Sequence, residues 1–242
     1  MYTAKKAPKY KLVILDFDGT LFDTVEALAH TFLLTFEELM PSHKLEKGTL
    51  YPLMSIGIPL KDTLRRLLPD DDRANTFDED LWVTTFRDLY AKHALEKQTP
   101  YAGAKDLLTG LKARGIPVAI VSNKVITVLF DALDRYQLSE YIRTDLVVGD
   151  PLYEGRRKPD PAGFSNVLLP RLKNIYGDDW MQRDGDILMV GDTVTDITFA
   201  RNIGARMCWF KRGNGNKKDC EAMRPDVTVE RLTRILDVVD SK

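Results

Sequence analysis

The residues best suited to chemistry stand near the start of the chain, in the stretch KLVILDFDGTLFDT from Lys11 to Thr24. Two aspartates, Asp16 and Asp18, flank one phenylalanine there. Residues two apart in an extended chain point to the same side, so both carboxylates are predicted to emerge together. Such carboxylates serve as nucleophiles, as general acids or bases, or as metal ligands. A strand followed by an ordinary polar turn has a similar composition, so this stretch alone does not decide between chemistry and structure.

Further polar residues follow other apolar runs that are predicted to be strands. They are Ser122, Asn123, Lys158, Asp192 and Asp196. Because the carboxyl ends of parallel strands lie on one side of a sheet, we expect these groups to converge with the first two aspartates. Clustered carboxylates repel one another unless a cation lies among them, and oxygen-only ligands are typical of Mg²⁺. Lysine and hydroxyl groups bind phosphate oxygens. The sequence therefore predicts a site for a divalent metal and an anion.

Strand and helix patterns alternate over most of the chain, and these elements would position the polar groups. Apolar runs predict strands at 12–15, 118–121, 146–148, 187–190, 207–210 and 227–229. Helical periodicity predicts helices at 104–114, 125–136, 161–176, 195–203 and 232–239. This alternation indicates an α/β fold with a Rossmann-like parallel sheet. The strands at 207–210 and 227–229 are expected at the edge of the sheet.

The segment from about residue 24 to residue 95 has helical periodicity and no strand pattern between its helices. It is interpreted as an inserted, all-helical cap domain over the end of the first strand. The predicted organisation is a lead-in at 1–10, a catalytic core at 11–23 and 96–242, and the cap at 24–95.

Composition limits the classes of function. The chain has 242 residues with 35 basic and 36 acidic side chains, a balance that predicts no nucleic-acid partner. No apolar run has the length of a membrane span and the N-terminal segment has no secretory pattern, so no membrane partner is expected. Cys208 and Cys220 lie far apart in the sequence, which predicts reduced thiols and a cytoplasmic location.

Four segments together resemble the motifs of the haloacid dehalogenase-like (HAD) hydrolase superfamily in order and spacing. They are DFDGT at Asp16, SN at Ser122, KPDP at Lys158 and GDTVTD at Gly191. The segment TPYAGAKDLLTGLKARGIPVAIVSNK resembles a block of its phosphoglycolate phosphatase-like branch. The resemblance covers the chain from Lys11 to Val239, and the joint occurrence is much more specific than any single motif. It implies a mobile cap that closes over the substrate.

The resemblance also implies a Mg²⁺-dependent phosphatase with catalytic residues Asp16, Asp18 and Lys158. Asp16 would form an aspartyl-phosphate, Asp18 would transfer protons, and Lys158 would balance phosphate charge. The implied substrate-binding residues are Thr20, Ser122, Asn123 and Lys158. The implied metal ligands are Asp16, Asp18 through its backbone carbonyl, Asp192 and Asp196. For Asp196, orientation of Lys158 or of a metal-bound water and a purely structural place at a helix start both stay open.

Three further segments are not assigned a catalytic role. A cap loop with Gly57, and Arg65 or Arg66 behind it, resembles the part of the cap that meets the substrate. Arg156 and Arg157 are interpreted as a solvent-exposed basic loop. The segment 211–218 (KRGNGNKK) is expected to be flexible.

The leading interpretation is hydrolysis of a small phosphorylated metabolite by a monomer or homodimer. A β-phosphoglucomutase-like phosphomutase would keep the same motifs, and a catalytically inactive binding module would keep the fold. Retention of both Asp16 and Asp18 disfavours the inactive module. A dehalogenase is disfavoured because such relatives lack an acid equivalent to Asp18. The substrate itself is not predicted.

Overall fold

The structure is a computed structural model that describes residues 9–55, 58–69, 77–152, 156–180 and 185–241. Its centre is a parallel sheet with the strand order β5, β4, β1, β6, β7, β8. The strands are β1 (Leu12–Leu15), β4 (Val118–Val125), β5 (Val147–Asp150), β6 (Ile187–Gly191), β7 (Arg206–Phe210) and β8 (Val227–Val229). The helices around it are α5 (Ala104–Ala113), α6 (Ile126–Arg135), α7 (Leu169–Tyr176), α8 (Val194–Asn202), α9 (Lys217–Ala222) and α10 (Arg234–Asp240). The predicted α/β class is confirmed.

Strand β1 lies in the middle of the sheet and is buried on both faces. Val13 and Leu15 pack into the hydrophobic cluster under α5, α6 and α10, whereas Leu12 and Ile14 pack into the cluster under α7 and α8. This alternation explains the unbroken apolar run, because both sets of side chains need an apolar environment. Burying each such side chain is worth about 1.5–3 kcal/mol, so β1 is a rigid support for the residues that follow it.

The expectation of two edge strands is wrong for β7. Strand β7 pairs with β6 on one side and with β8 on the other, so of these two strands only β8 is an edge. Its run from Met207 to Phe210 is fully buried, which requires cover on both faces. The short β8 has only one buried residue, Val229, as suits an edge.

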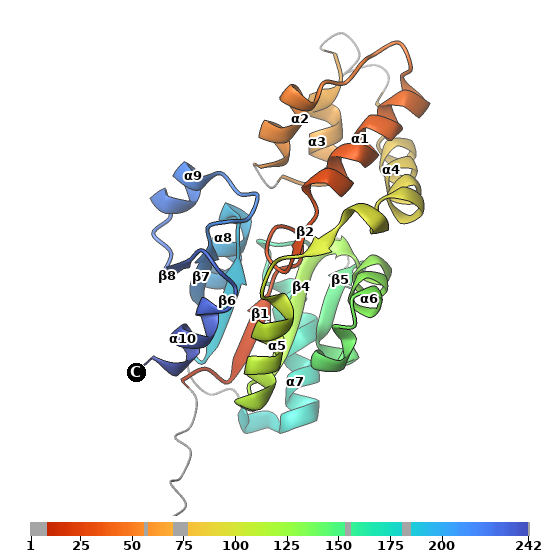
Figure 1. Cartoon of the computed structure of the whole chain (residues 1–242). Helices are drawn as coiled ribbons and strands as arrows, with labels where there is room; N and C mark the ends of the chain where they lie inside the picture. The colour runs from red at the N-terminus through yellow and green to blue at the C-terminus, as the bar shows by residue number, and fades with distance from the viewer. Residues whose placement is uncertain (1–8, 56–57, 70–76, 153–155, 181–184, 242) are drawn as a thin grey trace, which may run out of the picture.

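Between the first and second strands of the large sheet, the chain forms a group of helices. Within the described residues these are α1 (Val25–Leu39), α2 (Lys47–Met54), α3 (Leu60–Leu67), α4 (Glu79–His93) and the short 3-10 turn Leu95–Lys97. They share a hydrophobic cluster of their own that includes Phe32, Phe36, Leu64, Trp82 and Phe86. Figure 1 shows α1–α4 above the carboxyl ends of the strands. The predicted cap architecture is confirmed, while the residue boundaries of the domains stay a prediction.

A small antiparallel pair, not predicted from the sequence, lies where the chain enters and leaves the helical insertion. Its strands are β2 (Phe22–Asp23) and β3 (Thr99–Pro100), with Phe22 opposite Pro100. The two crossings are therefore held side by side at the base of the cap (Figure 1). Two-residue strands are too short for their periodicity to be recognised in a sequence.

A membrane-spanning helix would need a long and strongly apolar segment. No helix among the described residues combines the necessary length and apolarity.

Candidate active site

Asp16 and Asp18 lie directly beyond the carboxyl end of β1, as predicted. The backbone N–H of Asp16 donates to the carbonyl of Val190 in β6 at 2.9 Å, which continues the parallel pairing up to the site. Gly19 then turns the chain with φ +77°, a backbone conformation that other residues adopt at a cost. A Cβ at Gly19 would also overlap the carboxylate of Asp192. Glycine is required here by both conformation and space.

Three carboxylates from two strand ends converge beside one lysine. Carboxylate oxygens of Asp16, Asp192 and Asp196 lie within 4.8 Å of one another. The Lys158 ammonium donates to Oδ1 of Asp16 at 2.7 Å and to Oδ1 of Asp196 at 2.6 Å. All four side chains are buried. The sequence-based expectation that these residues converge is confirmed by this geometry.

The electrostatics of this cluster favour a bound cation. Burial, together with repulsion from Asp196, raises the pKa of Asp16 to about 7, against the lowering effect of Lys158. Burial and the neighbouring carboxylates also raise the pKa of Asp192 well above its ordinary value. Although burial alone would lower the pKa of Lys158, Asp16 and Asp196 raise it, so the ammonium stays charged. One buried lysine does not neutralise three carboxylates, and an oxygen-only donor set of this kind fits a hard divalent metal.

Asp192 is held by groups from three other parts of the chain. Thr20 Oγ1 donates to its Oδ1 at 3.1 Å, while the backbone N–H groups of Asn214 and Gly215 donate to its Oδ2 at 2.6 and 3.1 Å. The Trp209 indole donates to its backbone carbonyl at 3.0 Å. The bonds from Thr20, Asn214 and Gly215 fix the carboxylate, and the bond from Trp209 fixes the backbone behind it.

The loop 211–218 does not match its interpretation as a flexible segment. It runs against Asp192, and a Cβ at Gly213 would overlap both the carbonyl oxygen of Gly19 and the Asp192 side chain. Its glycines permit close approach of backbone to the site rather than mobility. A flexible loop and a loop that packs closely against a site can both be rich in glycine. Composition therefore does not distinguish them, and sequence reasoning missed this loop as part of the site.

Asp196 both caps the start of α8 and pairs with the charged Lys158. It is the third residue of α8 and forms a capping box with Thr193, whose N–H and hydroxyl donate to Oδ2 of Asp196 at 3.0 and 2.7 Å. Its other oxygen accepts from Lys158. Asp196 therefore joins the start of α8 to Lys158, which suits orientation of that ammonium, and a metal contact by Asp196 stays a prediction.

Ser122 and Asn123 lie at the end of β4 and line the same cavity as the carboxylates. The Asn123 amide brackets the backbone of Lys158, accepting from its N–H at 2.8 Å and donating to its carbonyl at 3.1 Å. Ser122 Oγ accepts from the N–H of Lys124 at 3.2 Å. Thr20 is fully buried against Asp192 and is not among the residues that line the cavity. Direct substrate contact by these three side chains stays a prediction.

Lys124 is a site residue that sequence reasoning missed. Its ammonium donates to the two carboxylate oxygens of Asp18 at 2.9 and 3.2 Å and lies 4.0 Å from the ring centroid of Tyr90 in α4. Burial alone would lower the pKa of Lys124, but Asp18 and Tyr90 raise it by more than burial lowers it. The ammonium therefore remains charged. The carboxylate of Asp18 is therefore outside the three-carboxylate cluster and faces the cap.

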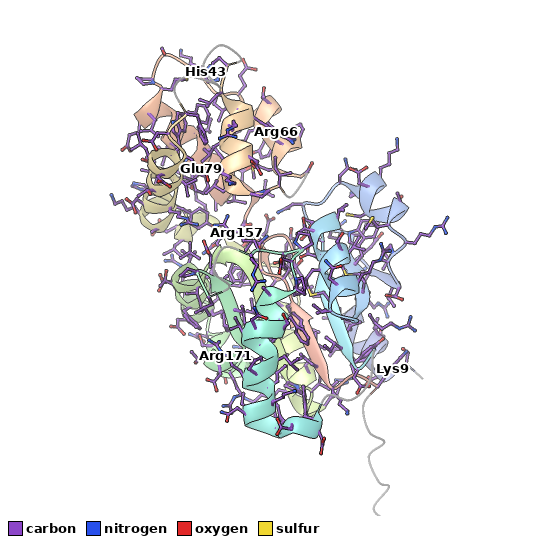
Figure 2. The ribbon with its side chains drawn as sticks, turned by 180° about the vertical axis from the view of Figure 1, so that it is seen from behind. Lys9, His43, Arg66, Glu79, Arg157 and Arg171 are labelled. Carbon is purple, nitrogen blue, oxygen red and sulfur yellow. The ribbon has the colours of Figure 1, made fainter. Side chains whose placement is uncertain are left out.

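The cap residues singled out from the sequence do not all reach the site. Gly57 lies outside the described residues. Arg65 lies 5.0 Å from the Phe77 ring and near Glu79 within the cap, and Figure 2 shows Arg66 on the cap, well above the junction with the core. Neither arginine is among the described residues that line the catalytic cavity.

Of the two arginines interpreted as a solvent-exposed basic loop, Arg156 is exposed, whereas Arg157 is half-buried. Its guanidinium donates to Oδ2 of Asp150 at 2.8 Å, and Arg87 of α4 donates to the same oxygen at 2.6 Å. Figure 2 shows Arg157 at the junction of cap and core. The buried Asp150 at the end of β5 draws both arginines inward, a long-range attraction that local composition does not reveal.

Comparison with known proteins agrees with this fold and site. The model of the haloacid dehalogenase-like hydrolase family matches residues 13–210. A pyrophosphatase named PpaX from Halalkalibacterium halodurans is 27% identical over 231 residues, covering 95% of this chain and 97% of the relative. A phosphoglycolate phosphatase from Aquifex aeolicus is 27% identical over 232 residues, covering 96% and 97%.

Solved structures show the same fold. A haloacid dehalogenase-like family hydrolase from Streptococcus pneumoniae has a TM-score of 0.77 at 20% identity, covering 95% of this chain and 98% of the other. A HAD-superfamily hydrolase of subfamily IA from Geobacter sulfurreducens has a TM-score of 0.66 at 18% identity, covering 98% and 100%.

The fold is that of an α/β protein whose candidate active site lies at the carboxyl ends of parallel strands. The chain belongs to the haloacid dehalogenase-like hydrolase family, and it is a hydrolase of the phosphatase kind.

Proposed function

We propose that the protein is a Mg²⁺-dependent phosphatase that hydrolyses a small phosphorylated metabolite through an aspartyl-phosphate on Asp16. The observation that carries this proposal is the buried cluster in which Lys158 bridges Asp16 and Asp196 beside Asp192. A nucleophile, a fixed positive charge and a set of metal ligands then share one cavity of about 210 Å³. This volume accommodates a phosphoryl group.

Asp16, Asp192 and the backbone carbonyl of Asp18 would hold the metal, with Asp196 acting through Lys158. A bound Mg²⁺ would supply positive charge between the nucleophile and the phosphate oxygens. The bonds from Asn214 and Gly215 to Asp192 support this assignment, since they orient a metal-binding carboxylate without neutralising it.

In the first step, an Asp16 oxygen attacks phosphorus and the bond to the leaving oxygen breaks, with its electron pair going to that oxygen. Asp18, which has to enter this step in its protonated form, donates that proton to the leaving alkoxide. In the second step, Asp18 withdraws a proton from the water that attacks the phosphoenzyme, which restores the Asp16 carboxylate. Lys158 balances charge on the transferring group in both steps. Lys124 supports the assignment of Asp18, because it fixes both oxygens of that side chain.

We also infer a small-molecule partner rather than nucleic acid or membrane, a monomer or homodimer, and a cytoplasmic location. Support for the partner class comes from the net charge of −1. Support for the compartment comes from Cys208 and Cys220, both buried as free thiols, with burial raising the pKa of each to about 12.

Phosphate release from a panel of phosphomonoesters, with Mg²⁺ and with a chelator, tests the proposal. We expect release that stops when the metal is removed. Full turnover with chelator would contradict the metal assignment, and interconversion of sugar phosphates without net release would favour the phosphomutase alternative.

A further inference from the structure

A second cavity opens beside the catalytic one, between the cap and the core. Its volume is about 440 Å³, roughly twice that of the catalytic cavity. The two cavities share wall residues, among them Asp18, Leu28, Met54, Asn123 and Arg157. Figure 2 shows one of these, Arg157, at the junction of cap and core. A phosphomonoester with its phosphoryl group beside Asp16 would therefore extend its leaving group into this second cavity.

The wall that the cap contributes to this cavity is largely apolar. It contains Leu28 and Phe32 from α1, Met54 from α2, and Phe86 and Tyr90 from α4. Such a wall binds hydrocarbon by removing it from water, at about 25 cal/mol per Å² of apolar surface. A leaving group made only of charged oxygens gains nothing from this wall.

The charges that face the cavity are already compensated among the described residues. Lys124 is bonded to Asp18, and Arg87 and Arg157 share Asp150. Asp88 also lines the cavity and adds a negative charge. Each of the three cations that line the cavity therefore already has a carboxylate partner, although Asp150 itself is not among the lining residues. A second anionic group on the substrate, such as a carboxylate or another phosphate, would have to compete with these carboxylates.

Size leads to the same conclusion. Glycolate, the alcohol released from phosphoglycolate, occupies on the order of 100 Å³, about the share of three liquid waters. It would leave most of the 440 Å³ unfilled. Apolar pockets of this volume with a few polar groups are typical of sites for larger organic ligands.

We propose that the substrate is a phosphomonoester of a bulky, mainly apolar and uncharged alcohol, whose carbon body fills the cavity between α1, α2, α4 and the end of β4. The proposal rests on the proposed phosphatase function. It differs from the activities in the names of the relatives, pyrophosphatase and phosphoglycolate phosphatase.

Benzyl phosphate and ethyl phosphate are a matched pair of probes, because both release a simple primary alcohol and differ mainly in apolar size. We expect kcat/KM for benzyl phosphate to exceed that for ethyl phosphate, phosphoglycolate and pyrophosphate by on the order of 10²-fold, the scale of hydrophobic pocket discrimination. Met54→Lys places a charge on the wall and should reduce the benzyl-to-ethyl ratio by about 10-fold or more. Leu81→Lys is the control, since Leu81 is 50% exposed on α4 and lies outside the cavity wall; the ratio should not change.

The possible outcomes distinguish a failure of the proposed substrate class from a failure of the proposed phosphatase function. A higher kcat/KM for phosphoglycolate or pyrophosphate than for benzyl phosphate would overturn the apolar substrate class while leaving the phosphatase in place. The same holds if Met54→Lys and Leu81→Lys behave alike. Absence of phosphate release from every ester, p-nitrophenyl phosphate included, would instead contradict the phosphatase itself.

Discussion

The ammonium of Lys124 bonds to both carboxylate oxygens of Asp18, at 2.9 and 3.2 Å. Lys124 Nζ also lies 4.0 Å from the centroid of the Tyr90 ring, so this one side chain contacts both the proposed proton donor and the cap. Proton transfer to a leaving oxygen requires the protonated form of Asp18 at a fixed position, and the contact with Lys124 supplies that position.

Replacing Lys124 tests whether it positions Asp18. Lys124→Met should lower kcat for ethyl phosphate by on the order of 10²-fold, because that alkoxide needs a proton from a correctly placed acid. The loss for p-nitrophenyl phosphate in its attack step should be smaller, since that leaving group needs no proton. Lys124→Arg should restore part of the rate. An equal loss in burst rate with both esters would indicate a structural role only.

Lys158 bridges two buried carboxylates, and its removal tests the assigned electrostatic role. Lys158→Met should lower kcat by on the order of 10²-fold or more, comparable to the loss of one preorganised donor. The control is Lys105→Met on the exposed face of α5, which should keep the wild-type rate. An unchanged kcat/KM in Lys158→Met would remove this residue from the reaction.

Metal binding should depend on pH in a direction set by the carboxyl groups. Burial raises the pKa of Asp16 to about 7, whereas an unfolded aspartate has a pKa of about 4. Between about pH 4 and pH 7, Asp16 is therefore protonated in the metal-free native state and ionised in the unfolded state. The free energy of unfolding falls as the pH rises through this window. Mg²⁺ competes with that proton, so it should raise Tm more at pH 8 than at pH 6.

The same measurement has a matched control. Asp192→Asn should abolish most of the Mg²⁺-induced rise in Tm, while Asp131→Asn, an exposed change on α6, should leave it intact. Equal stabilisation by Mg²⁺ at both pH values, or in both variants, would contradict the proposed ligand set.

Asp150 joins the cap to the core through Arg87 and Arg157. Asp150→Ala removes two charge-assisted bonds and leaves two guanidinium groups close together, so it should destabilise the protein by about 1–3 kcal/mol. Hydrogen exchange in α4 should become faster, because Arg87 no longer holds that helix against the core. Asp145→Ala breaks an exposed pair with Arg143 and should change urea unfolding little. Unchanged exchange in α4 would show that this contact does not hold the cap.

Much of the sheet could be predicted because each strand and helix has a recognisable pattern in its own stretch of sequence. The run from Leu12 to Leu15 is apolar on both faces, and the strand directions follow from the alternation with helices. The convergence of Asp16, Asp192 and Lys158 follows from that topology without any knowledge of side-chain contacts.

The features that were missed depend on contacts between distant parts of the chain. The two bonds from Asn214 and Gly215 to Asp192 span more than 20 residues, and the pair of Lys124 with Asp18 spans 106. Nothing in the residues next to Lys124 indicates which acid it will meet. The inner position of β7 likewise depends on β8, a strand of three residues with weak patterning.

The central claim is that Asp16 carries the phosphoryl group while Asp18 transfers protons. Asp18→Asn keeps the backbone carbonyl and should retain Mg²⁺ binding, yet lose roughly 10²–10⁴-fold in steady-state rate. With p-nitrophenyl phosphate, attack should be impaired less than hydrolysis of the intermediate, so phosphate should accumulate on the enzyme. The matched variant Asp16→Asn lacks the attacking oxygen and should form no phosphoenzyme.

Mass spectrometry of acid-quenched Asp18→Asn after reaction with p-nitrophenyl phosphate and Mg²⁺ is the most direct test. The proposed mechanism predicts one added phosphoryl group, mapped to the peptide that contains Asp16 and absent from Asp16→Asn. Phosphate on any other residue, or a phosphoenzyme that persists in Asp16→Asn, would contradict it.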